Sequence, residues 1–145
     1  MRMIRPPLRV SEQGFTLLEI MVVVVIIGLL VAAVAPNLMN NLSRAEVNRA
    51  KTDLRQIETA LNLYRLDNFR YPSTAEGLEA LVTNPGEASA PNWKQQLPKP
   101  PVDPWGQTYM YASPGQHGDF DVFTYGADRQ EGGEDTNADI GNWEL

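Results

Sequence analysis

Oxygen-bearing side chains gather at the end of the chain, where residues 125–145 carry six acids and one arginine. Suitable donors recur there as Asp128, Gln130, Asp135, Asn137 and Asp139. Ca²⁺ takes about 6–8 carboxylate, amide and main-chain oxygens in flexible loops, whereas Mg²⁺ demands tighter octahedral geometry. Two interpretations remain open, a calcium-binding loop and a solvated acidic tail. Ile140 and Trp143 favour the first, because apolar side chains serve no purpose in a disordered tail.

Glu19 is the second unusual residue, because it lies in a run that is otherwise apolar except for Thr16. A carboxylate inside lipid costs a few kcal/mol, so such a residue suggests a function, and its partner should be named. If the chain is cut before Phe15, the new α-amine lies about one helical turn from Glu19. The amine of a neighbouring copy can then pair with this carboxylate and set the axial stagger between subunits. The alternative is a carboxylate solvated among lipid headgroups.

The apolar run itself predicts a membrane-spanning helix. Residues 15–35 would extend over about 31 Å as an α-helix, which matches one bilayer core. The preceding segment carries Arg2, Arg5 and Arg9, so the positive-inside tendency places it in the cytoplasm and sends the rest across the membrane. An ordinary secretory signal is the alternative, but its apolar core is shorter and a cleavage site follows it. Here a helical pattern continues beyond the run, which favours a retained helix.

Beyond Pro36 the helical pattern becomes amphipathic. Apolar residues recur at spacings of three and four in one stripe: Val47, Ala50, Leu54, Ile57, Leu61 and Tyr64. We therefore predict one long helix from residue 15 to about 66, bent near Pro36, whose second half packs on a sheet. The remaining chain predicts a short helix capped by Ser73 or Thr74, a proline-rich loop over 84–104 and a hairpin. The strands of that hairpin are expected over 108–112 and 119–125.

Composition excludes several other classes of site. The chain has no cysteine, which rules out disulfides and thiolate ligands, and its net charge of −6 argues against a nucleic-acid partner. His117 is the only histidine and is interpreted as a surface residue, so no metal triad or Ser-His-Asp set is expected. Asp119 and Asp121 are interpreted as solvated strand acids. An anchored enzyme would need a pocket with convergent polar groups, and we predict a protein without catalytic activity.

A family resemblance rests first on the segment Gly14-Phe15-Thr16-Leu17-Leu18-Glu19 and the apolar run after it. This segment resembles the processing site of type IV prepilins and type II secretion pseudopilins. In that family a prepilin peptidase cuts after the glycine and methylates the new N-terminus. The resemblance thus implies cleavage between Gly14 and Phe15, N-methylation of Phe15 and an assembly role for Glu19.

Further segments are similar to the major pseudopilin of type II secretion, the general secretion pathway protein G family. They are Tyr64–Asn68, Tyr71-Pro72, Glu76–Leu81, Asp103-Pro104-Trp105-Gly106 and the ending from Gly126 to Trp143. The resemblance implies an α+β, type IV pilin-like fold, in which a long kinked N-terminal helix packs on a small antiparallel sheet and a calcium loop follows. The implied parts are a leader (1–14), a transmembrane and assembly helix (15–36) and a periplasmic domain (37–145). That domain divides into an amphipathic helix (about 37–66), a loop and sheet (67–124) and an acidic calcium loop (125–143).

The function implied is that of the major structural subunit of a pseudopilus. The subunit would wait in the inner membrane as a single-pass protein, then polymerise in the periplasm and drive folded proteins across the outer membrane. Implied partners are other copies, minor pseudopilins, the prepilin peptidase and the inner-membrane secretion platform. The family also binds calcium in this loop, which implies ligands at Asp128, Asp139 and the Tyr125 carbonyl, with Asp135 and Asn137 matching less closely. An adhesive or motility pilin is the alternative, disfavoured because such pilins commonly close this region with a disulfide.

Overall fold

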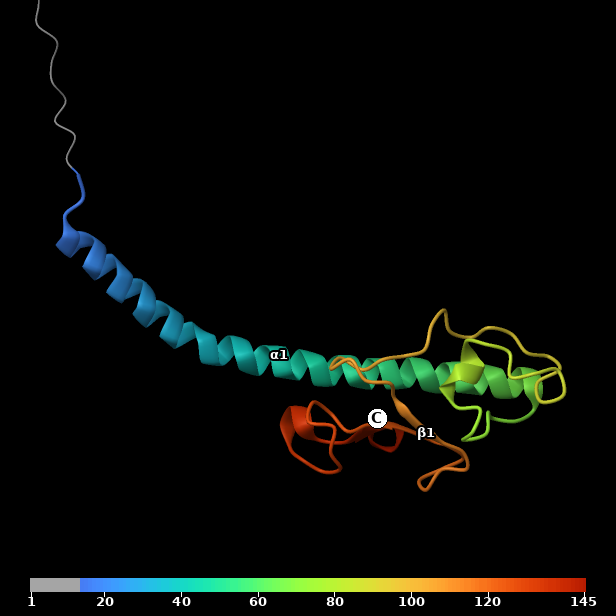
Figure 1. The fold of residues 1–145 in the computed structure, drawn as a ribbon. Coiled ribbons are helices and arrows are strands. Elements are labelled where there is room, and N and C mark those ends of the chain that lie inside the picture. Colours follow the sequence, from blue (N-terminus) through green and yellow to red (C-terminus); the bar gives the residue numbers. More distant parts are fainter. Residues whose placement is uncertain (1–13) are drawn as a thin grey trace, which may run out of the picture. The chain divides into compact units, whose positions relative to one another are not determined.

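The computed structural model describes residues 14–145, apart from the side chains at positions 36 and 37. All of the predicted leader except Gly14 therefore lies outside the described residues. The elements in chain order are α1 (Leu17–Asn68), the 3-10 helix η1 (Leu78–Leu81), β1 (Met110–Ala112), β2 (Asp121–Thr124), η2 (Asp135–Asn137), β3 (Ile140–Gly141) and η3 (Asn142–Glu144) (Figure 1). The chain divides into two compact units, Met1–Met39 and Asn40–Leu145, and α1 contributes to both.

Helix α1 is the single long helix that the sequence predicts, 52 residues from Leu17 to Asn68. It begins after Thr16, whose Oγ1 accepts a hydrogen bond from the Glu19 N–H at 3.2 Å. Threonine and glutamate at this spacing are typical of a helix N-terminus, where the hydroxyl satisfies a free amide. The helix ends where the Phe69 N–H bonds to the Arg65 carbonyl at 2.7 Å and Phe69 adopts a φ of 61°.

In the first unit, α1 contains a stretch long and apolar enough to cross a membrane, and none of that stretch is buried within the described residues. Its side chains are exposed from Leu17 to Val34. A core helix of similar composition would be covered by the rest of its own domain. This half of α1 therefore requires lipid or another protein to cover it.

In the second unit, one face of α1 supplies six of the fourteen buried apolar residues that form the core of the described chain. The predicted stripe is confirmed: its buried members are Ala50, Leu54, Ile57, Leu61 and Tyr64, joined by Ala60, while Val47 is partly buried. Buried side chains from the rest of the unit pack against them, among them Leu78, Leu81, Tyr109, Phe120, Val122 and Ile140. Strand β1 and the C-terminal segment lie on one side of the second half of α1 (Figure 1). Helix and sheet thus form two layers around this core.

The sheet has three antiparallel strands in the order β1-β2-β3. The predicted hairpin is confirmed as β1 and β2, with Met110 opposite Phe123 and Ala112 opposite Asp121. Strand β3 was not predicted, because a two-residue strand within an acidic tail has no periodicity to reveal it. The predicted short helix is a 3-10 turn at η1, and residues 84–101, all of them described, form no helix or strand.

The two acids near β2 differ from one another. Asp119 is exposed, as predicted, and pairs with Arg65 at 3.3 Å. Asp121 is buried, so its interpretation as a solvated acid is wrong. Its carboxylate accepts hydrogen bonds from the Gln116 N–H at 2.8 Å and the His117 N–H at 3.2 Å, and contacts His117 Nδ1 at 3.0 Å. Burial alone would raise the pKa of Asp121, but these bonds outweigh it and hold the pKa below its usual range.

Candidate functional site: the assembly helix and the acidic loop

Glu19 lies in the first turn of α1, three residues after the capping Thr16. Its main-chain N–H is used by the cap, but within residues 14–145 no hydrogen bond or ion pair engages its carboxylate. Phe15, just before the helix, is also exposed. The structure thus leaves the carboxylate available for a cation from outside the described chain. The cleavage, methylation and assembly roles of Gly14, Phe15 and Glu19 stay predictions at this point.

The acidic loop connects β2 to β3, and the strand register defines its neck. Thr124 pairs with Ile140, and Phe123 pairs with Gly141. Tyr125 directly follows β2, and Asp139 directly precedes β3. Two of the residues predicted as calcium ligands are therefore the first and last residues of the loop between these strands.

Two main-chain carbonyls of this loop lie close to Gly126. The Ala127 N–H bonds to the Thr136 carbonyl at 2.8 Å, which joins the two sides of the loop. Gly126, at a φ of 69°, lies so close to the carbonyls of Thr136 and Ala138 that a Cβ would sit 2.5 and 2.9 Å from their oxygens. Only glycine allows this approach, and it concentrates carbonyl oxygens beside the neck.

Asp139 carries the clearest sign of a missing partner. Its Oδ2 accepts a hydrogen bond from the Gly132 N–H at 2.9 Å. Its Oδ1 is buried and has no hydrogen-bond partner among the described residues. A buried carboxylate oxygen without a donor is costly, and a cation at this position would remove that cost.

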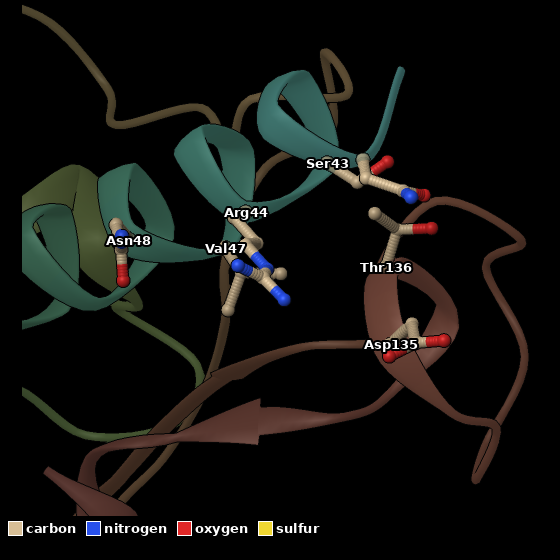
Figure 2. A pocket seen from close by; sticks show the side chains of 7 residues that line it. Ser43, Arg44, Val47, Asn48, Asp135 and Thr136 are labelled. Carbon is tan, nitrogen blue, oxygen red and sulfur yellow. The ribbon is translucent and has the colours of Figure 1, made fainter. Parts of the chain in front are cut away.

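The other predicted ligands lie nearer the surface. Asp128 is exposed, and its Oδ1 accepts a hydrogen bond from the Gln130 N–H at 3.1 Å, within its own turn. Asn137 is also exposed. Asp135 lines a hollow of about 640 Å³ between η2 and α1, together with Thr136, Ser43 and Arg44 (Figure 2). The structure therefore puts Tyr125 and Asp139 next to the paired strands and leaves Asp128, Asp135 and Asn137 at the surface of the loop.

This arrangement suits a hard cation that is held largely by carbonyls. Within residues 14–145, no three histidine or acidic side chains converge as metal ligands commonly do. A cation here would instead use Asp139 Oδ1, main-chain carbonyls and oxygens from the loop. Ca²⁺ accepts mixed oxygen sets of this kind in irregular geometry, so the residues present fit calcium.

Asp103 is a buried acid whose role the sequence did not reveal. Its Oδ1 accepts hydrogen bonds from the N–H groups of Trp105 at 3.0 Å and Gln107 at 2.8 Å. Its Oδ2 accepts the Thr124 hydroxyl at 2.5 Å, which ties the proline-rich loop to β2. An aspartate before proline and glycine signals a turn, and that signal was present in Asp103-Pro104-Trp105-Gly106.

Comparison with known proteins agrees with this geometry. The family model "Type II secretion system (T2SS), protein G" matches residues 37–143, and the "Prokaryotic N-terminal methylation motif" matches residues 9–35. The second match includes Gly14, Phe15 and Glu19.

Similar proteins match most of the chain. Type II secretion system core protein G of Pseudomonas aeruginosa is 53% identical over 139 residues, covering 94% of this chain and 98% of that protein. The Vibrio cholerae protein of the same name is 53% identical over 137 residues, with coverages of 93% and 94%. The crystal structure of the major pseudopilin from the type 2 secretion system of enterohaemorrhagic Escherichia coli matches with a TM-score of 0.64 at 42% identity. That match covers 76% of this chain and 96% of the solved one. The chain therefore belongs to the type II secretion system protein G family, whose members are the major pseudopilins of that system.

Proposed function

We propose that the first half of α1 anchors this chain in the inner membrane until the chain is cut between Gly14 and Phe15 and Phe15 is methylated. The subunits then polymerise in the periplasm into a pseudopilus that drives folded proteins across the outer membrane. The prepilin peptidase, minor pseudopilins and the inner-membrane secretion platform are the proposed partners, and the role is structural rather than catalytic. The observation that carries this proposal is the uncovered apolar half of α1 with one unpaired carboxylate near its start.

Glu19 is proposed to select the register between subunits. Apolar helices gain little from the hydrophobic effect when they move from lipid to protein, so packing and polar contacts decide how they associate. Pairing the Glu19 carboxylate with the Phe15 amine of a neighbour neutralises both charges. Any other register leaves both charges unpaired in an apolar environment, which is costly.

The loop between β2 and β3 is proposed to hold Ca²⁺. Asp139 and the Tyr125 carbonyl would bind at the neck, with further oxygens from Asp128, Asp135 and Asn137. The bound ion would order the loop. The support is the buried Oδ1 of Asp139, which has no hydrogen-bond partner among the described residues, together with the carbonyls of Thr136 and Ala138 close to Gly126.

The test of assembly uses the full chain produced with its secretion components, followed by electron microscopy of sheared fractions and mass analysis of the mature N-terminus. We expect filaments built of subunits that begin at methylated Phe15. Glu19→Gln should keep membrane insertion and cleavage but lose filaments, because it removes the charge that pairs between subunits. Glu87→Gln, an exposed loop position, is the matched control and should assemble normally. Normal filaments from Glu19→Gln would refute the register mechanism, and an absence of filaments from the unaltered chain would refute the proposed function.

A further inference from the structure

A group of side chains attaches the C-terminal segment to the turn that joins β1 to β2. His117 lies in this turn, and its Nδ1 lies 3.0 Å from Oδ2 of the buried Asp121. Because an ionised carboxylate only accepts hydrogen bonds, this contact assigns a proton to Nδ1. The main-chain N–H of His117 also donates to Asp121, at 3.2 Å. The imidazole is therefore held in place although the His117 side chain is 46% exposed.

The other contact of the imidazole is with Trp143, in η3. The two ring centroids are 4.0 Å apart and the ring planes differ by 16°, which is close stacking. The same indole lies so close to Gly141 that a Cβ there would overlap its atoms Cη2 and Cζ2. Only glycine therefore permits this packing. We call Asp121, His117, Trp143 and Gly141 the C-terminal stack.

Other restraints on this end of the chain are few. Strand β3 has two residues and, within residues 14–145, pairs with β2 alone. Asn142 accepts a hydrogen bond from the Val122 N–H at 2.9 Å and donates one to the Phe120 carbonyl at 3.4 Å. Chain ends are usually poorly ordered unless contacts tie them down. The C-terminal stack is therefore a main restraint on where β3 and η3 lie.

The position of β3 in turn sets the position of Asp139, which directly precedes it. Asp139 Oδ2 accepts the Gly132 N–H at 2.9 Å, and its buried Oδ1 has no hydrogen-bond partner among the described residues. Ligand oxygens have to lie within about 0.2 Å of the usual distance from a metal ion. Contacts that fix β3 therefore also limit where this candidate ligand can lie.

We propose that His117 is a positioning residue of the calcium site, because the C-terminal stack holds β3, and through it Asp139, in the arrangement that receives Ca²⁺. This inference rests on the proposed calcium function and adds residues outside the predicted ligand set. A ligand that is already ordered costs less to bind with than a mobile one. If loss of the stack leaves Asp139 in the binding arrangement about a tenth of the time, the dissociation constant for Ca²⁺ rises about tenfold.

Calorimetric titration of the full chain in detergent micelles with Ca²⁺ tests this role. We expect His117→Ala and Trp143→Ala each to weaken calcium binding about tenfold. Because both remove the same stack, the double variant should bind within about twofold of either single variant. Gln116→Ala is the matched control, since Gln116 is an exposed neighbour in the same turn that contacts Asp121 through its main chain. It should bind calcium as the unaltered chain does.

Thermal melting separates positioning from a general loss of stability. A purely structural role would lower the melting temperature of His117→Ala equally with chelator and with calcium. The proposed role predicts a small drop with chelator and a clearly smaller rise when calcium is added. Trp143→Phe keeps a ring on His117 and should recover most of the calcium affinity, which keeps the test decisive where Trp143→Ala does not fold.

The outcomes distinguish this inference from the calcium proposal itself. Equal calcium affinity of His117→Ala and the unaltered chain would overturn the positioning role and leave the calcium site intact. Equal losses of melting temperature with chelator and with calcium would overturn it too, as would a double variant weakened by the product of the two single effects. An unaltered chain that binds no calcium would overturn both proposals.

Discussion

Arg70 and Glu76 stabilise the chain just after it leaves α1. The guanidinium binds both carboxylate oxygens, with two N–O distances of 2.7 Å. Glu76 Oε2 also accepts the Ser73 N–H at 2.7 Å, and the Ser73 hydroxyl accepts the Glu76 N–H at 3.3 Å. The Arg70 guanidinium beside it lowers the pKa of Glu76 from 4.5 to about 2. A two-point ion pair of this kind is stronger than an ordinary surface pair.

This lowered pKa predicts that acid weakens the domain over a defined range. The folded state favours the ionised form of Glu76, so the stabilisation is complete above pH 4.5 and is lost as the pH falls toward about 2. We expect the loss to reach roughly 2–3 kcal/mol, measured by denaturant unfolding across this range. Glu76→Gln should be less stable at neutral pH and should lose less stability on acidification. An equal acid dependence in both proteins would contradict the assignment.

Asp139 is the residue on which the calcium proposal depends most. Adding a chelator should lower the melting temperature of a fragment that begins at Asn40, because the ion stabilises only the folded state. Asp139→Asn should already melt at the lower temperature and should not respond to the chelator.

Glu131→Gln is the matched control for Asp139→Asn, since Glu131 is an exposed acid of the same loop. It should keep the chelator response. If the chelator leaves the melting temperature of the unaltered fragment unchanged, the calcium proposal is wrong.

At the scale of elements, α1 presents leucines to two different environments. Leu54 is fully buried in the core, whereas Leu66 is 73% exposed. The two side chains are chemically identical and lie on the same helix. Replacing each of them by alanine therefore separates the contribution of packing to stability from that of helix propensity.

We expect Leu54→Ala to lower the free energy of unfolding by about 2–5 kcal/mol, because it removes buried methyl groups and leaves a cavity. Leu66→Ala should change it by less than about 0.5 kcal/mol, because its side chain is already in water. Denaturant melts of the fragment from Asn40 measure both. A similar loss in the two variants would show that the stripe does not form the core as described.

At the scale of the whole molecule, the folded domain is stabilised by its own core, without a contribution from the apolar half of α1. Every core residue lies between Ala50 and Ile140, so the first unit contributes nothing to the core.

The fragment from Asn40 should therefore fold cooperatively and remain monomeric, which melting and size-exclusion chromatography together can check. It should form no filaments, because it lacks Phe15, Glu19 and the apolar half of α1. Filaments from this fragment would contradict the role of α1 in assembly, and an unfolded fragment would contradict the independence of the domain.

Much of this architecture could be predicted from the sequence because it rests on local periodicity. The apolar run, the stripe from Val47 to Tyr64 and the hairpin repeat their pattern over many residues. Strand β3 and the burial of Asp121 could not be predicted, since each depends on a contact with a distant segment. The calcium ligands stay predictions made from residue type, whereas the burial of Asp139 Oδ1 became visible only in the folded chain.

The sequence by itself determined that a membrane-length helix with one acid precedes a small cysteine-free domain ending in an acidic loop. Spacing and side-chain chemistry along the chain were sufficient for that. The tertiary structure decided which acids are buried, which of their oxygens accept hydrogen bonds, and that Leu63, Leu66 and Phe69 remain exposed. Burial depends on which surfaces contact one another in the folded protein. The sequence alone therefore does not distinguish an apolar residue of the core from one at an interface.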